Sequence, residues 1–247
     1  MRFHETSDIS RFERSIRPDD IWLINQIPGV IAVARDENLR MIWCSELFPD
    51  LLEDVDSPDD LLGTTLHDIL TPMAAKEREQ VQREVIKSKK VIHHYQFSAD
   101  SRALCTLFPL DAEAFGHEGV LVIIKDAPNN TMIRKEQQIP VLSSPNLGEL
   151  SLLTPRELAL VHYVSKGHTT NAIAKSLSRS PSTIDNQIHS IFTKLNMHNR
   201  QELVQYATDR GIHSFSDEEW SRIVESSKSI KRERKNLDKA RTDQEQG

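Results

Sequence analysis

The chain has 247 residues, of which 38% are hydrophobic and 28% are charged, and its formal net charge is -6. These values are typical of a soluble globular protein with one or two domains. No apolar run approaches the roughly 20 residues that a membrane-spanning helix needs, and the polar start M-R-F-H-E-T-S-D does not resemble a secretory signal. Cys44 and Cys105 lack metal-ligand spacing, so we expect buried thiols in a reducing, cytoplasmic compartment.

Charge is distributed unevenly along the chain. Residues 1–126 contain 14 Lys and Arg against 23 Asp and Glu, a net of -9. Residues 151–213 contain 7 basic and 4 acidic side chains, a net of +3, and five of the ten histidines. This pattern indicates an acidic body joined to a mildly basic module, and only the module is expected to meet a polyanion.

Residues 1–17 are predicted to form an N-terminal arm, which leads into a domain over 18–126. A helix is expected within 17–27, and its apolar positions can pack on a sheet or on a second subunit. These positions are Ile21, Trp22, Ile24 and Ile27. The runs 30–34 and 39–44, on either side of Asp36-Glu37-Asn38, predict a hairpin. Ser45 is expected to cap a short helix that follows it.

The rest of this domain is predicted to contain one longer helix and three strands. The helix should begin after Thr71-Pro72, and the strands should cover 91–97, 102–110 and 119–126. The resulting order resembles a PAS domain, a small sensor and dimerisation module with a five-stranded antiparallel sheet. The segment 61–72 resembles the turn of that family into its long helix. The resemblance implies that residues 18–126 form an α+β domain that senses a signal or mediates dimerisation.

A linker is predicted over 127–150, because this segment contains three prolines, three asparagines and a Ser-Ser pair. Helical signals follow it. T-P-R-E at 154–157 has the pattern of a capping box, and the first helix should turn Leu158, Val161 and Val164 inward before it ends at Lys166-Gly167.

A second and a third helix are predicted on either side of the turn 178–180. The second should place Ile173, Ala174 and Leu177 inward. The third should begin with Ser180 as its cap and Pro181 in its first turn. Its apolar positions recur at helical spacing, at Ile184, Ile188, Ile191 and Leu195. Two helices joined by such a tight turn form a helix-turn-helix, whose second helix can enter a major groove of DNA.

The segment 151–210 resembles the LuxR-type, or GerE-like, DNA-binding domain of bacterial transcription regulators. The matching positions are Leu153, Thr154, Pro155, Arg156, Glu157, Gly167, Ile173, Ala174, Leu177, Ser180, Thr183, Ile184, Ile191, Lys194, Leu195, Arg200, Glu202 and Leu203. The resemblance implies an all-α four-helix domain over 151–213 that binds double-stranded DNA as a homodimer, with one recognition helix in each half-site.

Site residues follow from the same positions. The resemblance places Asp185, Asn186 and His189 at base-facing sites. It places Ser182, Thr183 and Lys194 at phosphate-facing sites, with Arg179 and Thr170 nearby. The chemistry is suitable, because Asn can pair with adenine, Asp can accept from the cytosine amino group, and His can donate to guanine N7. Hydroxyl groups, helix N-termini and Lys suit phosphates.

Three positions depart from the family pattern. Ala172 stands where a glutamate is usual, which suggests that a structural salt bridge is absent. Gln187 replaces a common histidine, and Asp185 replaces a frequent lysine. With a net charge of only +3 in this module, each protomer is expected to bind DNA weakly and to depend on dimerisation.

Residues 214–247 are predicted to form a charged tail, in which a short helix capped by Ser216 and Glu219 gives way to disorder. A dimerising coiled coil through Ile223, Ile230 and Leu237 is the alternative. The run K-R-E-R-K at 231–235 is either a phosphate contact or a solvated charge run.

Other chemistry finds little support in the sequence. His67, His93 and His94 are more typical of structural or exposed positions than of haem ligands. No catalytic set, metal site or cofactor is predicted, although a small ligand in the PAS-like domain is left open. We therefore expect a DNA-binding transcription regulator that is not an enzyme, with RNA polymerase as a further partner. A protein-interaction scaffold with a vestigial helix-turn-helix and a sigma-factor-like region are the alternatives.

Overall fold

A computed structural model describes residues 16–28, 30–52, 55, 57–98, 101–129 and 139–229. Most of the predicted arm, the centre of the predicted linker and the tail from residue 230 lie outside this set, and with them the predicted disorder, the coiled-coil alternative and the basic run. The chain divides into two compact units. The first contains residues up to 70, 75–93 and 105–125, and the second contains 71–74, 94–104 and the residues from 126 onward.

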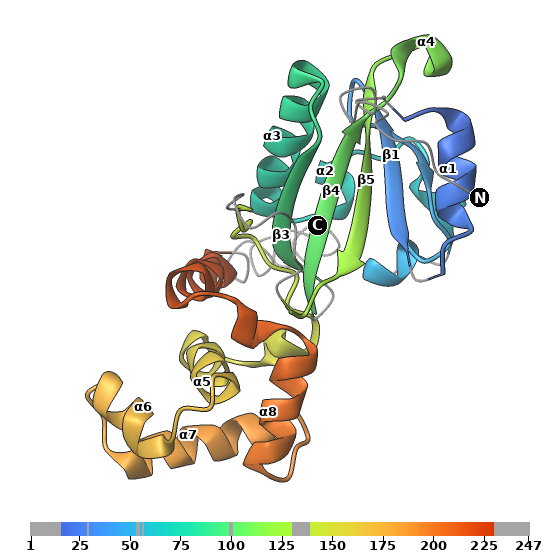
Figure 1. The fold of residues 1–247 in the computed structure, drawn as a ribbon. Helices are drawn as coiled ribbons and strands as arrows, with labels where there is room; N and C mark the ends of the chain where they lie inside the picture. Colours follow the sequence, from blue (N-terminus) through green and yellow to red (C-terminus); the bar gives the residue numbers. More distant parts are fainter. Residues whose placement is uncertain are drawn as a thin grey trace, which may run out of the picture. The chain divides into compact units, whose positions relative to one another are not determined.

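A five-stranded antiparallel sheet has the order β2-β1-β5-β4-β3 (Figure 1). Its strands are β1 (Ile31–Asp36), β2 (Met41–Cys44), β3 (Ile92–Ser98), β4 (Ser101–Pro109) and β5 (Gly119–Asp126). Strand β1 pairs antiparallel with both β2 and β5. The five strands are those expected from the sequence, so the predicted α+β fold class is confirmed for this part of the chain.

Helices accompany the sheet, and the first and the longest of them lie where the sequence predicted helices. They are α1 (Pro18–Asn25), α2 (Leu66–Ile69), the long α3 (Pro72–Ser88) and α4 (Ala112–Phe115), together with short 3-10 turns η2 (Pro49–Leu51) and η3 (Pro58–Leu61). Of the apolar positions expected on α1 and just after it, Ile21 is buried, whereas Trp22 is 64% and Ile27 is 52% exposed. The first unit therefore carries an uncovered apolar face beside Ile21.

The hairpin β1–β2 corrects one prediction and shows how the turn is held. Ser45 does not cap a helix, because its hydroxyl accepts a 3.0 Å hydrogen bond from the Ala32 backbone N–H and so joins the two strands. The register shifts between Ala34 and Arg35. The buried Arg35 guanidinium donates to the carbonyls of Leu39 and Thr64, and burial lowers its pKa to about 10.

The second unit contains η4 (Gly148–Leu152), the four predicted helices α5 (Pro155–Ser165), α6 (Thr170–Ser176), α7 (Pro181–Lys194) and α8 (Arg200–Asp209), and the turn η5 (Ile212–Ser214). A further helix, here called the tail helix, covers 217–229. One hydrophobic core joins the four helices to Phe215, Trp220 and Ile223. The predicted four-helix fold is confirmed, and its core extends past residue 213 into the short helix expected in the tail.

Part of the predicted linker is tied to a strand. The backbone of Tyr95 in β3 donates to the Pro140 carbonyl and accepts from Leu142, each at 2.8 Å, and Asn146 donates to the Phe97 carbonyl at 2.9 Å. These bonds occupy an edge of β3 that would otherwise present unpaired backbone groups. The described residues at the end of the linker therefore form ordered structure rather than a free connection.

Both cysteines are buried free thiols, as predicted, and burial raises the pKa of Cys105 to about 12. Across the described ranges, no cluster of His, Cys, Asp and Glu has the arrangement of a metal site. Nor does any helix in the part of the chain that the structure covers have the length and apolar character to cross a bilayer.

Candidate nucleic-acid interface

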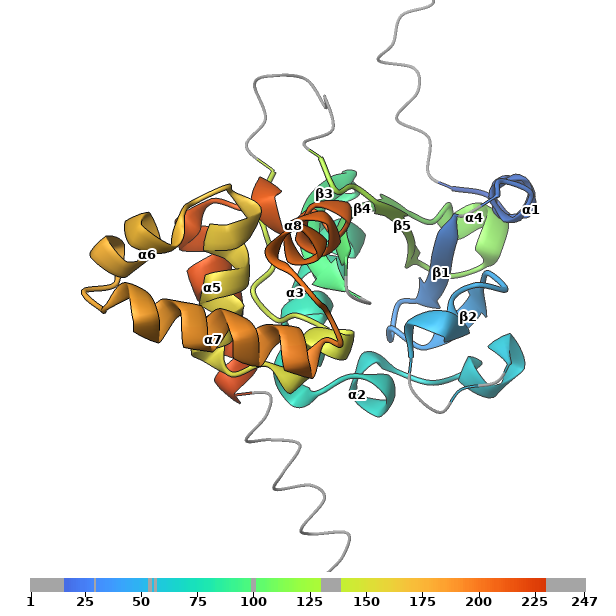
Figure 2. The same ribbon diagram turned by 90° about the horizontal axis from the view of Figure 1, so that it is seen from below.

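Helices α6 and α7 form the predicted helix-turn-helix and lie side by side in both views (Figures 1 and 2). Helix α6 ends with Leu177 as its C-cap. The chain reverses through Ser178, which has a φ of 51°. The Ser180 hydroxyl then accepts a 3.1 Å bond from the Thr183 backbone N–H, and Pro181 occupies the first turn of α7. The cap and the proline fix where α7 begins, as the sequence indicated.

The two faces of α7 separate as the helical spacing predicts. Ile184, Ile188 and Ile191 are buried in the core, while Asp185, Asn186 and His189 are exposed. Leu177 was expected to face inward, and that prediction is wrong: it is 36% exposed, because α6 has already ended there. The structure therefore brings the three predicted base-facing residues together on one solvent-exposed stripe.

Asp185 has a partner inside the domain. Its Oδ1 accepts a 3.0 Å hydrogen bond from the hydroxyl of Thr170 at the start of α6. The bond ties α6 to α7 and occupies part of the carboxylate that was expected to face a base. It also engages Thr170, which was expected to face a phosphate. The base-facing role of Asp185 and the phosphate-facing role of Thr170 stay predictions.

His189 and Asn186 differ in how their side chains are held. The Nδ1 atom of His189 lies 2.8 Å from the carbonyl oxygen of Asp185, one turn earlier. The His189 ring also meets the ring of Phe192 edge-on, with 5.7 Å between centroids. Asn186 is exposed, and its amide makes no hydrogen bond to the described residues. The His189 side chain is therefore held in one orientation, whereas the Asn186 side chain can change its rotamer.

The candidate phosphate contacts fall into two groups. Ser182, Thr183 and Arg179 are exposed around the N-terminus of α7, where a helix attracts anions, although the Thr183 hydroxyl also lies 2.8 Å from that of Ser180. Lys194, near the other end, lies 2.9 and 2.6 Å from the two carboxylate oxygens of Glu157. Its charge is therefore balanced inside the domain, and its phosphate-facing role stays a prediction.

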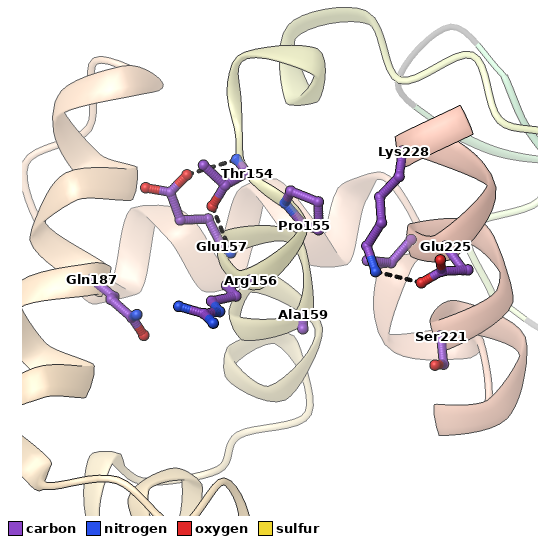
Figure 3. Close-up of a pocket in the computed structure, with 10 residues that line it drawn as sticks. Thr154, Pro155, Arg156, Glu157, Ala159, Gln187, Ser221, Glu225 and Lys228 are labelled. Atoms are coloured by element: carbon purple, nitrogen blue, oxygen red, sulfur yellow. Dashed lines mark hydrogen bonds and ion pairs between the residues drawn. The ribbon is translucent and has the colours of Figure 1, made fainter. Parts of the chain in front are cut away.

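Glu157 is the residue whose importance the sequence reasoning underestimated. The expected capping box with Thr154 is present (Figure 3), but the carboxylate also accepts a 2.8 Å bond from the Ser190 hydroxyl and pairs with Lys194. Burial raises the pKa of Glu157, but the bonds from Lys194, Thr154 and Ser190 outweigh it and bring the pKa to about 2. Glu157 thus fixes α7 on α5 through its charge.

The tail helix packs on α5 on the side away from α7 and contributes to the hydrophobic core of the four helices. The Trp220 indole N–H donates a 2.9 Å bond to the Leu158 carbonyl. The Trp220 ring stacks on His162 with 5.6 Å between centroids and an angle of 16°. The His162 Nε2 lies 3.1 Å from the Phe215 carbonyl oxygen. Burial lowers the pKa of His162, so the neutral ring is favoured there.

A groove lies between α5, α7 and the tail helix (Figure 3). Arg156 and Gln187 line one side of it, and Ser221, Glu225 and Lys228 from the tail helix line the other. Glu225 and Lys228 form an ion pair with each other. Gln187 stands where the family commonly has a histidine, and the structure places it in this groove rather than on the exposed stripe.

Residues 151–207 match the family described as "Bacterial regulatory proteins, luxR family". The chain is 33% identical to the transcriptional regulatory protein ComA of Bacillus subtilis (strain 168) over 91 residues, which are 37% of this chain and 42% of ComA. It is 35% identical to the response regulator UvrY of Escherichia coli (strain K12) over 60 residues, 24% of this chain and 28% of UvrY. The chain thus spans less than half the length of these relatives.

Two solved structures are similar at lower identity. The VqmA chain of a VqmA–ligand–DNA complex from Vibrio cholera has a TM-score of 0.43 and 18% identity, covering 81% of this chain and 90% of that one. The PAS domain of a protein from Colwellia psychrerythraea has a TM-score of 0.33 and 14% identity, covering 44% and 94%. The family match and the observed helices together define residues 151–207 as a LuxR-type helix-turn-helix domain.

Proposed function

We propose that the chain is a sequence-specific, DNA-binding transcription regulator of the bacterial cytoplasm, and not an enzyme. The observation that carries the proposal is the exposed polar stripe of α7. This helix is the second of the helix-turn-helix, and its N-cap and its buried apolar face hold it in place. This is the arrangement with which such domains enter a major groove. Asn186 and His189 are proposed base contacts, and Ser182, Thr183 and Arg179 are proposed phosphate contacts.

The proposal includes a homodimer, because the basic excess of the helical module is small and two half-sites multiply the affinity of each. A candidate dimer face is the apolar surface of α1 and the residues after it, where Trp22 is 64%, Leu23 57% and Ile27 52% exposed. The double variant Trp22→Glu with Leu23→Glu should shift the sedimentation coefficient towards that of a monomer. An unchanged coefficient would move dimerisation to another surface.

Selection of bound sequences from a random duplex pool tests the proposal directly. The wild-type chain should enrich an inverted repeat, and Asn186→Ala should relax one position in each half-site. No enrichment at low salt, where phosphate contacts are strongest, would favour the interaction scaffold with a vestigial helix-turn-helix.

RNA polymerase is a further partner in this proposal. The test is whether the DNA-bound chain retains RNA polymerase on an immobilised operator. DNA binding in this proposal needs no cofactor.

A further inference from the structure

The geometry points to His189 as a hydrogen-bond acceptor towards DNA. On this inference, the base that His189 contacts presents an exocyclic amino group, the N6 of adenine or the N4 of cytosine. The inference rests on the proposed function, since it concerns how the exposed stripe of α7 reads a base edge. It differs from the expectation that His189 donates to guanine N7.

The first step concerns the proton on the ring. The Nδ1 atom of His189 is 2.8 Å from the backbone carbonyl oxygen of Asp185. A carbonyl oxygen can only accept, so Nδ1 must carry the hydrogen. A neutral imidazole has one N–H, and once Nδ1 holds it, the other nitrogen presents a lone pair. Nε2 is therefore the acceptor that an incoming base would meet.

The second step concerns how firmly the ring is held in this orientation. The hydrogen bond joins residues four apart, which lie on the same face of the helix. The Phe192 ring contacts the imidazole edge-on at 5.7 Å between centroids, three residues further along. Contacts on both sides along the helix restrain the ring, and moving the proton from Nδ1 to Nε2 would leave two acceptors, Nδ1 and the Asp185 carbonyl oxygen, facing each other.

The third step concerns the neighbouring carboxylate. An acceptor at His189 would duplicate Asp185 if that side chain were also available to accept from a base. The Asp185 Oδ1 instead accepts from Thr170 on α6. Asp185 is thus a positioning residue: its carboxylate joins α6 to α7, and its backbone carbonyl orients His189. Of the other two predicted base-facing residues, Asn186 carries an amide that can both donate and accept, and His189 accepts.

The test removes single groups from the DNA. Comparison of sequences selected by the wild-type chain and by His189→Ala first identifies the position that His189 reads. At that position, adenine is then replaced by unsubstituted purine, or cytosine by 2-pyrimidinone, to delete the amino group. In a second duplex, N7 alone is deleted: 7-deazaadenine replaces adenine or, where the base is cytosine, 7-deazaguanine replaces its paired guanine. Binding is measured at pH 8.

The expected result is a loss confined to the duplex without the amino group and to proteins that retain His189. Deletion of the amino group should weaken wild-type binding by roughly 3- to 10-fold, the effect of one hydrogen bond, and should leave His189→Ala unaffected. Deletion of N7 should not change wild-type binding through His189. Asn186→Ala is the matched control, because it should bind more weakly overall yet keep the dependence on the amino group at the His189 position.

Three outcomes would overturn the inference, and they are distinguishable. If the duplex without N7 binds worse and the duplex without the amino group does not, His189 donates. If wild-type and His189→Ala select the same sequences with the same affinity, His189 does not face a base, although the proposed function stands. If the wild-type chain enriches no duplex while its circular dichroism shows folded helices, the proposed function itself fails and the inference fails with it.

Discussion

The inner side of the helical unit and the outer stripe of α7 use polar side chains in opposite ways. Inside, Glu157, His162 and Trp220 are each less than a tenth exposed, and each has a hydrogen-bond partner in the same unit. Outside, Asn186 and His189 keep polar atoms exposed to solvent on a helix whose other face is apolar. The first group fixes the helices to one another, and the second is available to a ligand.

This comparison shows that the type of a residue does not decide its role. Lys194 and Arg179 are both cations near α7, and either suits a phosphate. Lys194 lies within reach of a buried carboxylate, and an unpaired buried charge is so unfavourable that the ion pair takes precedence. Among the described residues, Arg179 has no carboxylate as an ion-pair partner, so its charge remains available to a phosphate.

The largest effect is expected from the inner side. Trp220→Ala should destabilise the helical unit by about 3–5 kcal/mol, because it removes a buried ring and its bond to Leu158. Urea unfolding measures this as a lower midpoint. Leu152→Ala is the matched control, since that side chain, in the same unit, is 61% exposed and its removal should change stability by less than about 0.5 kcal/mol. Equal, small effects of both variants would contradict the assignment of the tail helix to the core.

Glu157→Gln should be the next largest change. It leaves the shape intact but removes the charge that Lys194 faces, and we expect a loss of about 2–3 kcal/mol, below the range for a fully buried pair because Lys194 is half-buried. Glu225→Gln, in an exposed ion pair with Lys228, is the control and should be nearly neutral. If the two variants unfold at the same urea concentration, the pair does not hold α7 on α5.

The same carboxylate predicts a loss of stability in acid. The pKa of Glu157 is about 2 in the folded domain, below its ordinary value near 4.3. Its contribution is therefore complete above about pH 4.3 and is lost as the pH falls through about 2. Urea midpoints measured from pH 5 down to pH 2 should decline more steeply for the wild-type chain than for Glu157→Gln. Parallel curves would show that other groups cause the decline.

On the outer stripe, Asn186→Ala should reduce affinity for the selected operator by roughly tenfold, within the range of a lost base contact of about 1–3 kcal/mol. The free energy of unfolding should not change, because the side chain is exposed. Gln201→Ala, an exposed amide on α8, should alter neither quantity. If Asn186→Ala lost stability as well as affinity, Asn186 would hold the helices together, as Glu157 does, rather than contact only DNA.

The smallest effect separates the two cations. Arg179→Met should lower the salt dependence of DNA binding by about 0.9, the slope contributed by one phosphate contact. Lys194→Met should leave that slope unchanged under conditions where the variant is folded, because Glu157 already balances the charge. The logarithm of the association constant against that of salt concentration gives both slopes. A reduced slope for Lys194→Met would mean that DNA displaces Glu157.

Local signals in the sequence predicted much of the fold. Ser180 and Thr154 cap helices where the patterns placed them, and the five strands lie where apolar runs and turn residues indicated, because these signals depend on near neighbours in the chain. Ser45 matched a helix cap equally well, but its hydroxyl is used by Ala32 thirteen residues earlier. The predicted boundary before residue 214 fell where composition changes, while the core continues through Trp220 to Ile223.

By itself, the sequence determined the helix-turn-helix, the helix that would read DNA and the stripe of α7 that faces solvent. Only the tertiary structure decided which polar groups are already satisfied. Asp185 bonds to Thr170 and Lys194 pairs with Glu157, 15 and 37 residues away in the chain. No local pattern encodes such contacts, because they depend on how separate helices pack. For Glu157, the high free-energy cost of leaving a buried charge without a partner favours the ion pair as well.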